Sequence, residues 1–515
     1  MKKQYIYGAS IQGIQGFIFQ TNKLKEIVGA SQLVDNINQR EFKSFLEKRE
    51  YTVKSNNIIL NAAGNIRYLF EEEDLETLKK LVLEFPKHIT NYAPGVTISQ
   101  AVVKIDSNLK DAIDDLERKL KAQRNIVQMP VDIGFMGLER ARRTGGVGFK
   151  EHKTQKNEKE VIDKGTWEKI KMREEDTLHL FKKFTNKNIK KENVPFNIED
   201  ITNKGENSSW IAIIHADGNG LGNILQNMNK SLTNDDEVLV AYSTFSKQLE
   251  KATQEAAQKA FNVIVEGNEA VNNWIYPFRP VVLGGDDLTV IIRADLAYNF
   301  AKEFLTEFEK STKIHFKELY QKFGDRLNIL KEGLTACAGI AYIKDSYPFY
   351  YGVNLAEELT KKAKKFSKSK EVKGNELLPP SSLAFYKVQS SFTERLEDMI
   401  KRTHSINGKE KFFAGPYLTG KKINGYRTTD VLDNLLNILN EKYTSDKSRG
   451  ISKIRQWISE LHKGGAKADF MMDRIKEVNF GFYEELNLEG ERKEEKTLLS
   501  DLIDLHTFEQ IYKED

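Results

Sequence analysis

The alternation of apolar and polar residues along the chain predicts two successive units that mix strands and helices. In each unit a strand runs into a glycine-marked helix start, and a helix, an apolar hairpin, a second helix, a strand and a further helix appear in or near the same order. The first unit comprises segments at 5–19, 56–70, 71–85, 95–105 and 109–125. The second unit comprises segments at 210–225, 237–262, 279–293, 295–313, 334–344 and 355–368.

The turn residues of the two units correspond to one another, which indicates an internal duplication. Ser10 and Gly13 of the first strand-to-helix turn correspond to Asp217 and Gly220 of the second. The hairpin tip AAGN at 62–65 corresponds to GGDD at 284–287. Acidic residues therefore occupy these positions in the second unit alone.

The remaining segments differ in pattern from the two units. A lysine-rich, mostly helical connector separates them, and helical patterns dominate after Pro379, where SSLAFYKVQSSF can add an edge strand. We therefore predict four domains. Their boundaries are 1–148 for the first unit, 149–206 for the connector, 207–378 for the second unit and 379–515 for a helical domain.

Composition excludes several classes of protein. A mean hydropathy of -0.54 argues against a membrane span, and a net charge of +4 is too small for a wholesale nucleic-acid binder. The first residues show no secretory signal, so we expect a cytoplasmic protein. The single cysteine, Cys337, excludes a disulfide within the chain and a multi-cysteine zinc site. Its apolar surroundings predict a buried structural thiol.

The acidic hairpin tip is the first candidate for chemistry. Gly284 and Gly285 permit a sharp turn and a close approach of the backbone to a ligand. Asp286 and Asp287 repel each other unless a cation lies between them, and oxygen ligands favour Mg²⁺ or Mn²⁺. GGDD alone is equally typical of a surface turn. Asp217, at the end of the strand WIAIIHAD, supplies a third carboxylate and favours the metal site over that alternative.

Three acids, a glycine-rich helix start and a lysine are the parts that nucleotidyl transfer with two metal ions requires. We predict that Asp217, Asp286 and Asp287 are catalytic and bind the metals. For the lysine we favour Lys364 over Lys361 in KKAKKFSK, although a solvated helix face is an equally good interpretation of this run. For His215 we favour a hydrogen-bonded strand residue over a metal ligand.

These motifs resemble a known family. GGDD between apolar strands, the upstream ADGNGLG and the downstream AGIAY, PF, AEEL and AK are similar to the catalytic palm of the large polymerase/cyclase subunit of type III CRISPR effector complexes. That subunit is a relative of the GGDEF diguanylate cyclases. ASIQGIQGFIFQTNKLKEIVGAS resembles the family's first, degenerate palm, and LERARRTGG resembles the segment after it. The resemblance covers most of the chain and is strongest over 1–35 and 208–370.

The resemblance implies an α+β fold with two ferredoxin-like palm domains that bind ATP between them and make 3′–5′ cyclic oligoadenylates in antiviral defence. The first palm would be degenerate and bind a second ATP through Ser10 and its AAGN tip. Implied partners are ATP, guide RNA, target RNA and CRISPR effector subunits. The implied nucleotide-binding residues are Gly218, Asn219, Gly222, Gly284, Gly285, Lys364 and Ser10.

The sequence also departs from the family pattern. No His-Asp pair occurs, so we do not expect the family's nuclease domain, and the zinc-binding cysteines between the palms are missing. Asn219 stands where an acid is common, so this position either matters less than in the family or contacts ribose. Two alternatives stay open. One is a freestanding cyclic-dinucleotide synthase that works as a homodimer, and the other is a scaffold subunit of an RNA-guided complex with an idle palm site.

Overall fold

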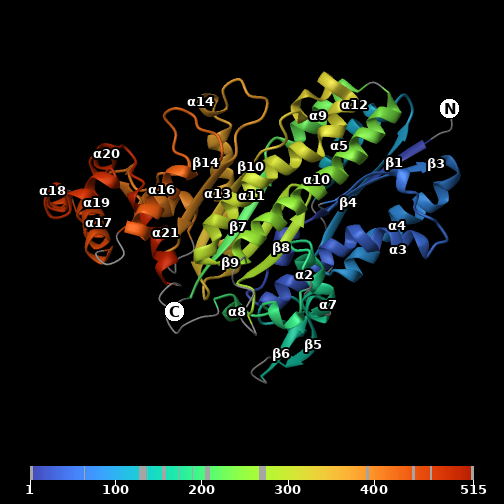
Figure 1. Ribbon diagram of the computed structural model, residues 1–515. Helices are drawn as coiled ribbons and strands as arrows, with labels where there is room; N and C mark the ends of the chain where they lie inside the picture. The colour runs from blue at the N-terminus through green and yellow to red at the C-terminus, as the bar shows by residue number, and fades with distance from the viewer. Residues whose placement is uncertain are drawn as a thin grey trace.

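The chain forms two neighbouring β-sheets with helices packed against them, and a mainly helical C-terminal part (Figure 1). The first sheet and the C-terminal helices lie on opposite sides of the second sheet. Among the described residues, no helix is both long and apolar enough to cross a membrane. The computed structural model describes residues 4–511 apart from 63, 127–134, 136, 154–157, 173, 188, 203–208, 233, 266–273, 390–393, 443–446 and 464–466. Ala63 of the predicted first tip lies outside the described residues.

The first sheet is antiparallel with the strand order β2-β3-β1-β4. One face carries aromatic residues that pack against the helices, with Tyr7 and Tyr68 contacting Phe42. Its strands are β1 (Gln4–Gln12), β2 (Ile58–Ala62), β3 (Asn65–Glu71) and β4 (Thr97–Ile105). Its helices are α1 (Ile14–Ile18), α2 (Leu24–Asn36), α3 (Phe42–Glu47), α4 (Leu75–Tyr92) and α5 (Leu109–Arg124).

The second sheet has the strand order β14-β11-β10-β7-β9-β8 and extends beyond residue 378, the predicted domain boundary. Strand β11 pairs in parallel with β10, and β14 pairs with β11. The strands are β7 (Trp210–Gly218), β8 (Phe278–Gly284), β9 (Asp287–Arg293), β10 (Ala336–Lys344), β11 (Ser382–Lys387) and β14 (Tyr417–Leu418). The helices are α9 (Leu221–Ser231), α10 (Asp235–Val265), α11 (Ala294–His315), α12 (Lys317–Phe323), α13 (Phe349–Ser367) and α14 (Lys370–Lys373).

Strand β7 is buried on both faces, and its alternation decides where the acids point. Ala212, Ile214 and Ala216 belong to the core shared with α10 and α11. Ile211 and Ile213 belong to the second core, which includes residues of α13. Because successive side chains of a strand point to opposite faces, the odd-numbered residues of β7 face α13. Asp217 is therefore placed on the α13 side.

The two units are duplicates in three dimensions, as the sequence predicts. Gly13 and Gly220 precede α1 and α9 with left-handed backbones, at φ 70° and 73°. The units also hold one another reciprocally. The Leu109 amide at the start of α5 donates to Asp235 Oδ1 at 2.8 Å, and the Phe349 amide at the start of α13 donates to Asn22 Oδ1 at 2.9 Å. Each unit thus caps a helix of the other, α5 in the first unit and α13 in the second. The strands and helices of both units confirm the predicted α+β class.

The connector contains a β-hairpin that its sequence did not signal. Strands β5 (Gly148–Lys153) and β6 (Lys159–Asp163) precede the helices α6 (Lys164–Lys171), α7 (Glu174–Lys182) and α8 (Ile198–Thr202). Before the hairpin, Arg143 forms two hydrogen bonds with the buried carboxylate of Glu26 on α2, which ties this segment to the first unit.

The C-terminal part is mainly helical, as predicted. A two-stranded hairpin follows its first helix. The elements are α15 (Leu396–Thr403), β12 (Ser405–Ile406), β13 (Lys409–Glu410), α16 (Thr429–Lys442), α17 (Lys447–His462), α18 (Ala468–Val478), α19 (Phe480–Glu485), α20 (Leu488–Lys493) and α21 (Leu499–Ile511). The Tyr417 hydroxyl on β14 donates to Asp501 Oδ2 on α21 at 2.6 Å, which joins this part to the second sheet.

This junction predicts a pH dependence of stability. Burial raises the pKa of Asp501 to about 7, whereas an unfolded aspartate titrates near 4. The folded protein binds the extra proton between these values, so the free energy of unfolding should fall as pH rises from about 4 to about 7, on the order of 4 kcal/mol in total. Asp501→Asn should remove this contribution. Urea denaturation at several pH values measures it, and equal pH slopes for variant and wild type would contradict the prediction.

Candidate active site

Three aspartates converge where β7 ends and the β8–β9 hairpin turns. The pairing of β7 with β9 ends at Ala216 and Leu288, so Asp217 and Asp287 follow the last pair on opposite strands. Asp286 lies in the turn between β8 and β9. One carboxylate oxygen from each of the three lies within 4.8 Å of the others. The structure thus brings together the three acids that the sequence singled out.

Two glycines make this arrangement possible. Gly285 has φ +63°, a left-handed conformation that side chains disfavour, at the first position of the turn. A Cβ on Gly218 would lie 2.7 Å from Asp286 Oδ2 and 2.8 Å from Asp286 Cβ. Because such contacts are too short, only glycine at 218 leaves room for the Asp286 side chain to reach Asp217.

The acids lie in an environment that disfavours their negative charge. Burial, followed by the charge of Asp217, raises the pKa of Asp286 to about 7. Burial and the charges of Asp286 and Asp217 hold the pKa of Asp287 well above its usual range. Without a cation, protonated forms are favoured here, whereas a divalent cation would stabilise the charged carboxylates. This electrostatic arrangement is typical of a metal-binding site.

Lys364 reaches this cluster from α13. Its ammonium donates to an Asp217 carboxylate oxygen and, at 2.7 Å, to the Gly218 carbonyl. The helix lies unusually close to the sheet here, since a Cβ on Gly339 of β10 would be 2.2 Å from the Ala356 carbonyl. The alternative residue, Lys361, is exposed and lies 3.7 Å from Glu357. Of the two lysines considered, Lys364 is the one in contact with the acids.

Glu357 is a residue that the sequence reasoning missed. It lies seven positions before Lys364 on α13, and helical periodicity places the two on the same side of the helix. Burial is the main cause that raises the pKa of Glu357, and the charge of Asp217 contributes to the rise. The seven-residue spacing from Lys364 was the sequence feature that could have identified Glu357 as a neighbour of the acidic cluster.

His215 is a hydrogen-bonded strand residue, as favoured above. Its Nδ1 lies 3.1 Å from Thr289 Oγ1 on β9, and its carbonyl accepts from the Thr360 hydroxyl on α13. Burial lowers its pKa to about 4, so the ring is neutral. The group of potential metal ligands found among the described residues comprises the three aspartates without this histidine.

The turn after β7 leaves the start of α9 accessible. A Cβ on Gly222 would meet nothing within 4 Å, and the first N–H groups of a helix attract phosphate. Asn219 is buried instead. Its Nδ2 donates to Thr335 Oγ1 at 3.1 Å, and its Oδ1 accepts from Cys337. The ribose contact predicted for Asn219 would require this amide to leave both partners.

Ser10 lies apart from the acids, at the equivalent end of β1 in the first sheet. It is buried, and its hydroxyl donates to Asn65 Oδ1 at 2.9 Å. Asn65 corresponds to Asp287, so a neutral hydrogen-bonded pair replaces the charged pair of the second unit. Cys337 is buried, as predicted.

The residues fit a divalent cation bound by oxygen ligands. Three carboxylates can supply such ligands, and the positive charge of Lys364 is outweighed by the burial and the neighbouring acids that raise the pKa of Asp286 and Asp287. Oxygen ligands without sulfur or imidazole suit Mg²⁺ or Mn²⁺. An accessible helix start beside them can accept an anionic ligand. The arrangement can therefore hold metal ions together with a polyphosphate.

Comparison with solved structures gives the fold of the whole chain. The Csm1–Csm4 cassette in complex with cA4 matches with a TM-score of 0.53 at 11% identity, covering 99% of this chain and 70% of that chain. The Csm1–Csm4 subcomplex in the type III-A CRISPR-Csm interference complex gives 0.51 at 11%, and the cassette with pppApA gives 0.50 at 12%. These cover 99% of this chain and 70% and 69% of the other chains. At such identities the likeness shows the fold alone.

Comparison with sequences identifies the second unit. No curated protein matches the chain. The family model described as Cas10/Cmr2, second palm domain, matches residues 210–372, a range that begins with β7 and includes the three aspartates and Lys364. This segment of the chain is therefore similar to Cas10/Cmr2 second palm domains, and the chain as a whole has a fold similar to that of Csm1.

Proposed function

We propose that the protein is a metal-dependent nucleotidyltransferase and cyclase that converts ATP into cyclic oligoadenylate in CRISPR-type antiviral defence. The convergence of Asp217, Asp286 and Asp287 beside Lys364, inside a Cas10/Cmr2 palm, carries this proposal. Support for the nucleotide class comes from the structural matches, because the matched Csm1–Csm4 cassettes are in complex with cA4 and pppApA.

The chemistry follows from the positions of the side chains. The 3′-oxygen of one nucleotide attacks the α-phosphorus of an ATP, the bond to the β-phosphate oxygen breaks, and pyrophosphate leaves. Two bound Mg²⁺ or Mn²⁺ ions would lower the pKa of the 3′-hydroxyl and neutralise the phosphates. Asp217, Asp286 and Asp287 would hold the ions, Lys364 would balance phosphate charge, and the start of α9 would bind phosphate oxygens through its N–H groups. In the last step, the terminal 3′-oxygen attacks the 5′ α-phosphorus of the same chain, which closes the ring and releases the last pyrophosphate.

The first palm would bind a second ATP without reacting. Its tip has the neutral Ser10–Asn65 hydrogen bond in place of paired acids, so it lacks the carboxylates that would hold metal ions there. Guide RNA, target RNA and effector subunits are the proposed partners of this function. A cyclic-dinucleotide product and an idle scaffold remain the competing hypotheses.

Product analysis separates these hypotheses. Purified protein incubated with Mn²⁺ and each nucleoside triphosphate should give cyclic oligoadenylates from ATP alone, because the proposed substrate is ATP. Mass spectrometry of the products identifies base and ring size. Cyclic dinucleotides as the main product would favour the synthase alternative, and the absence of any condensation product, with or without RNA and partner subunits, would favour the scaffold.

The acids can be tested directly. Asp286→Asn with Asp287→Asn removes two charges at nearly constant shape, and should reduce product formation by at least about 10³-fold because the metals lose two ligands. Asp325→Asn, at an exposed aspartate of the 3₁₀ helix Gly324–Leu330 outside the site, serves as the matched control. Thermal unfolding checks that the variants fold. Product formation by the double variant at the wild-type rate would refute the assignment.

Lys364 should act in opposite directions on metal binding and on turnover. Its ammonium already neutralises Asp217, so Lys364→Met should raise Mn²⁺ affinity in the absence of nucleotide by about threefold to tenfold. Loss of the phosphate contact should lower kcat by about 10²-fold. Electron paramagnetic resonance of free Mn²⁺ and steady-state kinetics measure the two effects, with Lys365→Met as the neighbouring control. A lower Mn²⁺ affinity in Lys364→Met would contradict the prediction.

A further inference from the structure

The turn that carries Asp286 lacks a support that its counterpart in the first palm has. There, the Ile11 amide donates to the Gly64 carbonyl at 2.8 Å, and the β1–β3 pairing continues to Ser10 and Asn65. In the second palm the β7–β9 pairing stops one pair earlier, at Ala216 and Leu288. No backbone hydrogen bond from Gly218 to the turn occurs among the described residues. The acidic turn therefore lacks the backbone support from its neighbouring strand that the turn of the first palm has.

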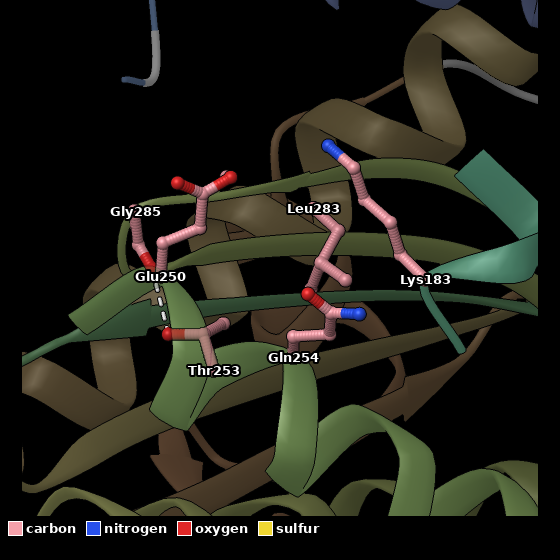
Figure 2. A pocket seen from close by; sticks show the side chains of 7 residues that line it. Lys183, Glu250, Thr253, Gln254, Leu283 and Gly285 are labelled. Carbon is pink, nitrogen blue, oxygen red and sulfur yellow. Dashed lines mark hydrogen bonds between the residues drawn. The ribbon is translucent and has the colours of Figure 1, made fainter. Parts of the chain in front are cut away.

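A threonine of α10 supplies a different support. The Thr253 hydroxyl donates to the Gly285 carbonyl at 2.6 Å, as Figure 2 shows, and the side chain is 1% exposed. The Leu249 carbonyl of the same helix lies 2.9 Å from this hydroxyl. A hydroxyl has one proton to donate, and the shorter distance favours Gly285. The bond thus fixes the carbonyl directly before Asp286.

The Thr253–Gly285 hydrogen bond lies beside a pocket. A small pocket of about 10 Å³ borders the turn between α10 and the connector. Figure 2 shows Glu250, Gln254 and Lys183 around this space, while Thr253 forms the hydrogen bond drawn to the turn. Because Gly284 and Gly285 line this pocket, side chains do not fully enclose the turn on that side.

We propose that Thr253 is a positioning residue for the metal site, an inference that rests on the proposed function. By holding the Gly285 carbonyl, it orients the peptide plane that leads into Asp286 and so sets where that carboxylate points. Displacements on the order of 1 Å in a reacting group cost rate steeply. Helix α10 is itself anchored to the first palm, because Asp235 at its start accepts a hydrogen bond from the Leu109 amide. Through α10, the position of the turn therefore depends on contacts with both palms.

Two substitutions isolate the hydroxyl. Thr253→Val keeps the shape and removes the donor, whereas Thr253→Ser keeps the donor. Thr306→Val is the matched control, because the Thr306 hydroxyl donates to Lys302 of its own helix, α11, away from the turn. The full-length variants are compared in Mn²⁺ affinity, in kcat and KM for ATP, and in hydrogen–deuterium exchange over residues 281–290.

We expect Thr253→Val to lower Mn²⁺ affinity and kcat by about tenfold each, with the KM for ATP changed by less than about threefold. Exchange over 281–290 should rise, and Thr253→Ser should restore all three readouts. Wild-type affinity, kcat and exchange in Thr253→Val would overturn the proposal, as would equal losses in the valine and serine variants. Hydrogen–deuterium exchange measures the mobility of the turn independently of catalytic activity. A wild-type protein that binds no Mn²⁺ and makes no product would refute the proposed function separately.

Discussion

Mutual repulsion among three carboxylates is the constraint around which the second palm is arranged. Asp217, Asp286 and Asp287 are held within coordinating reach of one another in an environment that raises the pKa of the last two. Ordinary folding energetics disfavours such a cluster, so the surrounding structure must enforce it. Gly218 leaves the space, Lys364 supplies one positive charge, and the buried strand β7 fixes the direction. Bound metal ions would neutralise the negative charge of the cluster and so stabilise it.

The duplication explains how one chain contains both this acidic tip and its neutral counterpart. Both units share the strand order around their first strand, the left-handed glycine before the following helix and the reciprocal helix caps. They differ at the tip. The first palm continues its β1–β3 pairing to Ser10 and closes with a neutral hydrogen bond, whereas the β7–β9 pairing of the second palm stops one pair earlier, before Asp217 and Asp287. Loss of the acids and the longer pairing occur together in the first palm.

Much of this could be predicted from sequence because its causes are local. Hydrophobic alternation located the strands, and the glycine and aspartate positions at 284–287 located the turn. The family resemblance supplied the tandem-palm order. Contacts across elements could not be predicted in this way. Thr253 bonds to a carbonyl 32 residues away, and Glu357 required the orientation of α13. The sequence favoured Lys364 over Lys361, but it did not show the contact of Lys364 with Asp217. The alternation of apolar and polar residues in the connector was too weak to predict the β5–β6 hairpin.

The central claim is that the three aspartates bind divalent cations together with a nucleoside triphosphate. Anomalous diffraction from crystals grown with Mn²⁺ and a non-hydrolysable ATP analogue tests it most directly. The account predicts manganese peaks within about 2.5 Å of oxygens from Asp217 and from the 286–287 pair, with the triphosphate beside Lys364 and the start of α9. Manganese bound elsewhere, or a triphosphate that leaves these carboxylates without a metal, would contradict it.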